Sequence, residues 1–213
     1  MKGQTKRKNK KVYGGGINDY HLPVYVDGKP IRAYKTWAEM IRRGFCQKFK
    51  EKYRVYADCQ VCDDWVYFTN FLRWYQDQQH PEGWVLDKDL LVKGNKIYSP
   101  TTSLFIEQSL NCFMTESTKA RGKYPLGISF REKTGRYIAQ CHSATTNKET
   151  HIGCFLSLED AVSAYKNFKW DQALIWIERV TNDNRYDSNR ERIIEALEVR
   201  YNPKHIDTRD TDC

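Results

Sequence analysis

Two acids flank a lysine at Asp87, Lys88 and Asp89, after an apolar run and before a Gly94–Asn95 turn. Carboxylates this close together can bind a divalent cation that activates water, and a neighbouring lysine can stabilise charge on a phosphate. A lysine with the ordinary pKa of about 10.4 is protonated at neutral pH, so Lys88 can hold a phosphate but cannot accept a proton. The alternative is that all three are solvated charges at the end of a strand.

The stretch from Gly83 to Asn111 resembles the core of the HNH endonucleases found in phage and intron-borne proteins. The matching residues are Leu86, Asp87, Asp89, Gly94, Asn95, Tyr98, Ser99, Pro100 and Asn111. The resemblance implies a hairpin and a helix that hold one divalent cation, Mg or a similar ion, against the scissile phosphate.

By this resemblance Asp87 and Asn111 are the metal ligands. We expect Asp87, Lys88, Asp89 and Asn95 to form the catalytic set, in which Lys88 holds the phosphate and Asn95 or Asn111 completes the site. The chain departs from the family pattern at two positions. Lys88 stands in place of the general-base histidine and Thr102 in place of the central asparagine. These departures favour the alternative of a nuclease core that has degenerated into a scaffold.

A second resemblance covers residues 124–165, which are similar to the DNA-binding domain of the APETALA/ethylene-response-factor family. The matching residues are Gly127, Ser129, Phe130, Thr134, Gly135, Tyr137, Ala139, Ile152, Gly153, Phe155, Glu159, Ala161, Ala164 and Tyr165. That family lays a three-stranded antiparallel sheet in the major groove, where every base pair has a distinct pattern of donors and acceptors.

We expect Arg131, Lys133, Arg136, Gln140 and Lys148 to contact the DNA. Alternation places Arg136, Ile138, Gln140 and His142 on one face of a strand, but it does not show which face is exposed. The alternative is a small packing module of a sheet and a helix, with a solvated outer face.

The elements that position these residues follow from turn signals and apolar spacing. Asp27–Gly28 predicts a hairpin turn. Helical spacing predicts helices over residues 34–50, with Thr36 as N-cap, and over residues 65–77.

In the C-terminal half, Lys133–Gly135 predicts a second hairpin and residues 151–155 a third strand. Ser157 is the expected N-cap of a long helix, and a shorter amphipathic helix opens near Ser188. The long helix covers one face of the sheet with Leu158, Ala161, Val162, Tyr165, Leu174 and Ile177.

The predicted fold class is therefore α+β, with an HNH-like (ββα-metal) module followed by a small three-stranded antiparallel sheet packed on a helix. The predicted segments are a basic flexible arm (1–16), the HNH-like nuclease module (17–114), a linker (115–125), the DNA-binding domain (126–180), and a C-terminal helix and tail (181–213).

The composition of the 213 residues favours a polyanionic partner. The formal net charge is +8 and the pI is about 9.0, and lysines and arginines displace the counterions condensed on a phosphate backbone. No apolar run has the length of a membrane span, and no secretory leader is recognised, so we expect an intracellular protein, in the host cytoplasm if a phage encodes it. No obligate protein partner is evident. Cys59 and Cys62 have zinc-ligand spacing without a second pair to complete the site.

The predicted function is a site-specific, metal-dependent endonuclease of double-stranded DNA, of the phage HNH homing type. A DNA-binding protein with the same two modules and no cleavage is the alternative. A plain regulatory transcription factor would leave residues 83–111 without a role. An RNA partner fits less well, because a groove-reading sheet suits B-form DNA better than A-form RNA.

Overall fold

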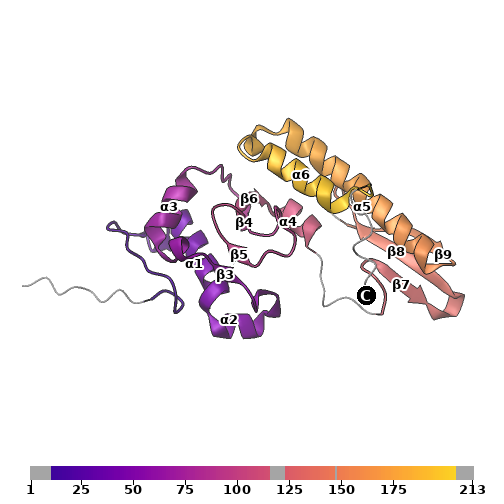
Figure 1. Ribbon diagram of the computed structural model, residues 1–213, viewed down its shortest axis with the longest axis horizontal. Helices are drawn as coiled ribbons and strands as arrows, with labels where there is room; N and C mark the ends of the chain where they lie inside the picture. The colour runs from indigo at the N-terminus through magenta and orange to yellow at the C-terminus, as the bar shows by residue number, and fades with distance from the viewer. Residues whose placement is uncertain (1–10, 116–122, 147, 205–213) are drawn as a thin grey trace, which may run out of the picture. The chain divides into compact units, whose positions relative to one another are not determined.

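The computed structural model describes residues 11–115, 123–146 and 148–204, which divide into two compact units (Figure 1). Unit 1 comprises residues up to 78 together with 86–105, and unit 2 comprises residues 79–85 together with those from 106 onward. Helices and small sheets occur in both, so the α+β prediction is confirmed. The finer assignment of an HNH-like module stays a prediction.

Unit 1 is built of short elements. In chain order they are β1 (Tyr25–Val26), β2 (Lys29–Pro30), α1 (Arg32–Phe45), α2 (Gln47–Lys52), the 3-10 helix η1 (Arg54–Tyr56), β3 (Gln60–Val61), η2 (Asp63–Val66), α3 (Phe68–Gln76) and β5 (Ile97–Tyr98). Strands β1 and β2 are antiparallel, and β3 and β5 are parallel. The division between the units passes through β4 (Trp84–Asp87) and β6 (Leu104–Glu107), which pair with each other.

The expected turn at Asp27–Gly28 is confirmed, since both residues have the positive φ of a tight hairpin turn, 49° and 74°. The expected N-cap at Thr36 is wrong. Helix α1 starts earlier, at Arg32, and the Thr36 hydroxyl donates to the Arg32 carbonyl at 2.9 Å inside the helix. The predicted helix over residues 34–50 is two helices, because Cys46 is extended between them.

The core of unit 1 is aromatic, as the sequence indicates. Trp37, Trp65, Phe68 and Phe71 are fully buried, and the Trp37 indole N–H donates to the Trp65 carbonyl at 2.7 Å. The Trp37 and Phe68 rings lie 5.3 Å apart between their centroids, so α1 and α3 pack through ring contacts.

Unit 2 carries a three-stranded antiparallel sheet. Its elements are α4 (Gln108–Met114), β7 (Ile128–Arg131), η4 (Glu132–Thr134), β8 (Arg136–His142), β9 (Glu149–Phe155), α5 (Leu158–Asn182), η5 (Asn184–Tyr186) and α6 (Arg190–Tyr201). The order is β7–β8–β9, and Gly135, with φ 62°, closes the first hairpin at the expected place. The third strand is also confirmed.

Helix α5 covers one face of this sheet with its first half. The Ser157 hydroxyl caps the helix by accepting from the Asp160 N–H at 3.0 Å, as predicted. Ala161 packs against Ile128 and Ala139, with rings and aliphatic side chains around them. Leu174, which we expected on the sheet, is instead 44% exposed, because it comes about two and a half turns after Tyr165 and so lies on the opposite side of α5. In the second half of α5, Ala173, Trp176 and Val180 continue the buried stripe of Ala161.

Parts of the predicted arm, linker and tail lie outside the described residues, namely 1–10, 116–122 and 205–213. Residues 11–16, the end of the predicted arm, form a turn in which the Val12 N–H donates to the Gly16 carbonyl at 2.7 Å. No helix within the described ranges is long and apolar enough to cross a membrane.

Candidate functional site

The Asp87 carboxylate stabilises the turn at the end of β4. Its Oδ2 accepts from the backbone N–H of Asp89 at 2.8 Å and of Leu90 at 2.6 Å. Asp87 is only 7% exposed, and this burial, together with the negative charge of Asp89, raises the pKa of Asp87 to about 6. The expectation of solvated charges at a strand end is therefore wrong for Asp87.

Lys88 is also buried, with 9% exposure, and its ammonium group has protein partners. Nζ donates to the Asn95 carbonyl at 3.0 Å and to Asp89 Oδ2 at 3.2 Å. The Asn95 amide nitrogen donates in return to the carbonyls of Lys88 and Ile97, at 2.6 and 2.7 Å. The predicted catalytic residues thus come together, but their polar atoms bind one another and the backbone.

Arg43 of α1 connects this loop to the rest of unit 1. Its guanidinium donates to the Tyr98 hydroxyl at 2.8 Å, and the Lys88 ammonium lies 5.9 Å from the centroid of the Tyr98 ring. Burial raises the pKa of Tyr98, so its hydroxyl stays neutral and accepts from Arg43. Thr102, in place of the family asparagine, donates to the Ile97 carbonyl at 3.0 Å and so closes the neighbouring turn.

The donor set for a metal ion is small. Asp87 and Asp89 supply two carboxylates, and Asn111 belongs to unit 2, in α4. Across the described ranges no three His, Cys, Asp or Glu side chains gather at one point. Mg²⁺ can bind through one or two carboxylates and several waters, so the fit of Asp87 and Asp89 to Mg²⁺ is partial. Burial raises the pKa of both Cys59 and Cys62. Two thiols are half of the four ligands that a structural zinc site needs.

The second predicted site lies on the face of the β7–β8–β9 sheet that is turned away from α5, which we call the outer face. In β8, Tyr137 and Ala139 pack toward the helix, so alternation directs Arg136, Ile138 and Gln140 to the outer face. His142 follows on the same side of β8, and pairing with β7 and β9 adds Ser129, Arg131, Glu149, His151 and Cys154. The exposed side of the strand, which the sequence left open, is therefore established.

Two arginines stand side by side on this outer face. Arg131 and Arg136 are directly paired across β7 and β8, and both are exposed. Like charges opposite each other destabilise a sheet, so this pair favours an anionic ligand. Lys133 lies in the turn between them and Lys148 in the turn before β9, both exposed, whereas Gln140 is half-buried. The outer face also carries Ile138, which is 7% exposed.

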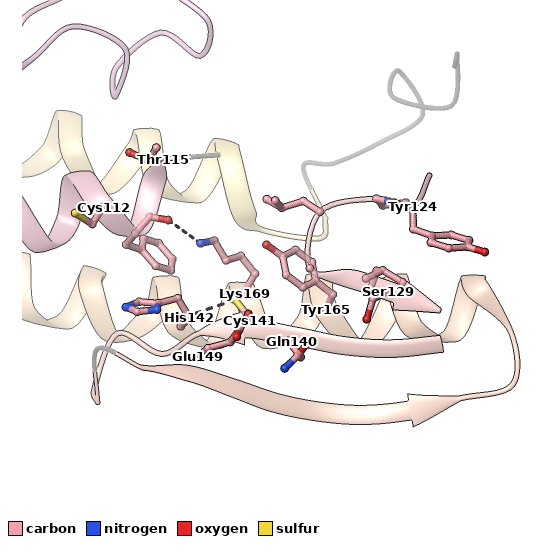
Figure 2. A pocket seen from close by; sticks show the side chains of 15 residues that line it. Cys112, Thr115, Tyr124, Ser129, Gln140, Cys141, His142, Glu149, Tyr165 and Lys169 are labelled. Atoms are coloured by element: carbon pink, nitrogen blue, oxygen red, sulfur yellow. Dashed lines mark hydrogen bonds between the residues drawn. The ribbon is translucent and has the colours of Figure 1, made fainter. Parts of the chain in front are cut away.

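A pocket of about 360 Å³ in unit 2 was not anticipated from the sequence. Figure 2 shows Lys169 of α5 directed at the end of α4, where Nζ donates to the Phe113 carbonyl at 2.7 Å. The ammonium also lies 3.7 Å from the centroid of the Phe113 ring. A signal was available, because Lys169 follows Ala161 and Tyr165 at intervals of four residues on the buried stripe. These contacts indicate that Lys169 fastens α5 to α4.

Comparisons with family models, with curated proteins and with solved structures found no match to this chain. The two family resemblances therefore depend on the residues quoted for them, and they stay predictions.

Proposed function

We propose that the protein binds double-stranded DNA through the outer face of the β7–β8–β9 sheet. The observation that supports this most directly is the exposed pair Arg131 and Arg136, set directly opposite each other on the face away from α5. Two forked guanidinium groups in one row match phosphates and guanine edges, and a two- or three-stranded ribbon fits the major groove.

Gln140 lies further along the same face of β8, where its amide can donate to and accept from an adenine edge. Lys133 and Lys148 extend the positive charge at the two turns, so they are suited to phosphates rather than bases. Glu149, opposite His142, is an exposed acid on this face and disfavours a phosphate at that end. The arginine end of the sheet is therefore the proposed centre of the contact.

The test is the affinity for a pool of random duplexes and for duplexes selected from it. Arg131→Ala and Arg136→Ala should each weaken the selected duplex about tenfold, since a bidentate contact contributes about 1–3 kcal/mol. Lys166→Ala is the matched control, because it removes one exposed cation from α5 on the other side of the sheet. Equal losses in all three variants would show nonspecific attraction and would refute recognition by the outer face.

Metal-dependent cleavage of the bound duplex is the second candidate function. The observation that favours it is the pair Asp87 and Asp89, since burial and then the charge of Asp89 raise the pKa of Asp87, and a divalent cation would relieve the repulsion between the two carboxylates. Two contacts disfavour this function, because they occupy the carboxylates that a cation would need. The Lys88 ammonium donates to Asp89, and backbone N–H groups donate to Asp87.

Incubation of duplex DNA with Mg²⁺ or Mn²⁺ separates the two candidates. We expect intact DNA with the wild type, because the Asp87 loop is satisfied internally. If the wild type cuts the duplex and Asp87→Asn does not, the protein is an endonuclease that uses Asp87.

A further inference from the structure

Three aromatic rings lie outside the core of unit 1, in the segment that runs from α2 to η1. None of residues 47–58 is buried, yet Phe49, Tyr53 and Tyr56 belong to this segment. The Phe49 centroid lies 4.7 Å from that of Tyr53 and 5.6 Å from that of Tyr56. Phe49 and Tyr56 are half-buried and Tyr53 is exposed, so the group leaves aromatic surface that is available to a ligand.

Cations surround these rings. The Arg42 guanidinium lies 4.5 Å from the Phe49 centroid, and the Lys52 ammonium lies 5.3 Å from that of Tyr53. Lys48 and Arg54 are exposed nearby, and among the described residues no carboxylate lies within ion-pair distance of Lys48, Lys52 or Arg54. Arg42 is paired with Glu39, and Glu51 is the one acid within residues 47–56, so the charge of this surface is positive overall.

Two of the cations are fixed in place. Arg43 lies 5.4 Å from the Tyr56 centroid while its guanidinium donates to the Tyr98 hydroxyl. Lys50 Nζ donates to the Cys59 carbonyl at 2.8 Å. These bonds hold η1 and α2 against the rest of unit 1, so a ligand meets rings that are already ordered, which lowers the entropic cost of binding.

We propose that residues 47–56, with Arg42 and Arg43, form a binding surface for single-stranded nucleic acid. Bases stack on exposed rings while cations contact the phosphates, and this combination tolerates any sequence. Tyr53, which is 42% exposed, offers the most accessible ring. In a duplex the bases stack on one another, so their faces are not available to Tyr53. This surface belongs to unit 1 and does not depend on the sheet of unit 2.

The test is fluorescence anisotropy with labelled oligothymidylate of about 12 nucleotides, within the length that such surfaces span, and with oligouridylate of equal length. Tyr53→Ala should weaken binding of both about tenfold, whereas Tyr53→Phe keeps the ring and should bind within about twofold of the wild type. An unchanged thermal midpoint shows that the variants are folded. If Tyr53→Ala weakened the binding of only one of the two polymers, stacking of bases on Tyr53 independently of the sugar would be refuted.

The salt dependence tests the phosphate contacts. Lys48→Gln/Arg54→Gln should lower the slope of log K against log salt by about 1.4, or about 0.7 for each lost single-strand contact. Lys29→Gln/Lys35→Gln removes the same charge from exposed positions elsewhere in unit 1 and should change the slope less. Equal changes in the two double variants would overturn the assignment to this surface.

Two further measurements distinguish this proposal from the proposal that duplex DNA binds to the sheet of unit 2. Arg131→Ala/Arg136→Ala should leave oligothymidylate binding unchanged, even if duplex binding is lost. A duplex of equal length should compete weakly for the surface. Oligothymidylate binding that Tyr53→Ala leaves intact, or equal loss of duplex and single-strand binding in that variant, would refute stacking on Tyr53.

Discussion

The Asp87–Asn95 loop of unit 1 and the outer face of the unit 2 sheet are both charged, but they differ in where the charges point. Lys88 and Asp87 are buried and bonded to the loop backbone, whereas Arg131 and Arg136 are exposed and adjacent. A polar side chain whose atoms are bonded internally contributes to the loop and not to a ligand, whereas an exposed like-charged pair favours a ligand. Burial therefore distinguishes two charged stretches that look equally functional in the sequence.

The largest expected effect is on the free energy of unfolding when the Asp87 acceptor is removed. Asp87→Ala leaves the buried N–H of Leu90 and the part-buried N–H of Asp89 without an acceptor and should cost about 3 kcal/mol. Urea denaturation at pH 5, below the folded pKa of about 6, measures this with Asp87 protonated in the folded state. Asp89→Ala, which removes a half-exposed neighbour, should cost less than about 1 kcal/mol. Equal losses would contradict a structural role specific to Asp87.

The free energy of unfolding should depend on pH through the buried carboxyl of Asp87. Because the pKa of Asp87 rises from 3.8 in the unfolded chain to about 6 in the fold, the folded state holds its proton more tightly. The resulting stability is present in full below about pH 4 and is lost as the pH rises through 6, by on the order of 2–3 kcal/mol. Asp87→Asn should remove this fall, because a neutral amide imitates the protonated carboxyl. An unchanged pH profile in Asp87→Asn would assign the fall to another group.

Asn95→Ala should cost about 2 kcal/mol in the free energy of unfolding. Its side chain donates to two carbonyls, and its Oδ1 accepts from the Ile97 N–H at 3.1 Å, so three bonds close the loop. Asn70→Ala is the control, since Asn70 makes one exposed bond to the Asp64 carbonyl. A loss no greater than that of the control would show that the loop does not need its asparagine.

Substitution of the two arginines on the outer face of the sheet should change the free energy of unfolding less than the loop substitutions do. Arg131→Ala/Arg136→Ala should leave the unfolding free energy within about 0.5 kcal/mol of the wild type or raise it, because the variant removes a like-charge pair from an exposed surface. Thermal unfolding measures this alongside the duplex affinity. A loss greater than about 1 kcal/mol would indicate that the arginines hold the sheet together.

Local rules predicted much of the fold. The turns at Asp27–Gly28 and Gly135 and the cap at Ser157 depend on residues adjacent in the chain, so the sequence shows them directly. The alternation along β8 was also predictable, although the exposed side was not, since that depends on where α5 packs.

What the sequence could not show depends on contacts between distant residues. Lys88 has the sequence context of a surface lysine, and it is buried because Tyr98 and Asn95 fold over it. Leu174 is different, because a position about two and a half turns after Tyr165 lies on the opposite side of α5 from the residues that cover the sheet, so its exposure could be predicted from helical spacing. The burial of Lys88, by contrast, depends on a loop that closes over it.

The most direct test of the account follows backbone and arginine side-chain NMR signals of the full chain during titration with a selected duplex, with and without Mg²⁺. If DNA binds to the outer face of the sheet, the shifted signals lie in β7, β8 and β9, centred on Arg131 and Arg136, and those of residues 87–95 stay unchanged. Shifts that appear at Asp87 and Asp89 only when Mg²⁺ and DNA are both present, with the sheet unaffected, would contradict it.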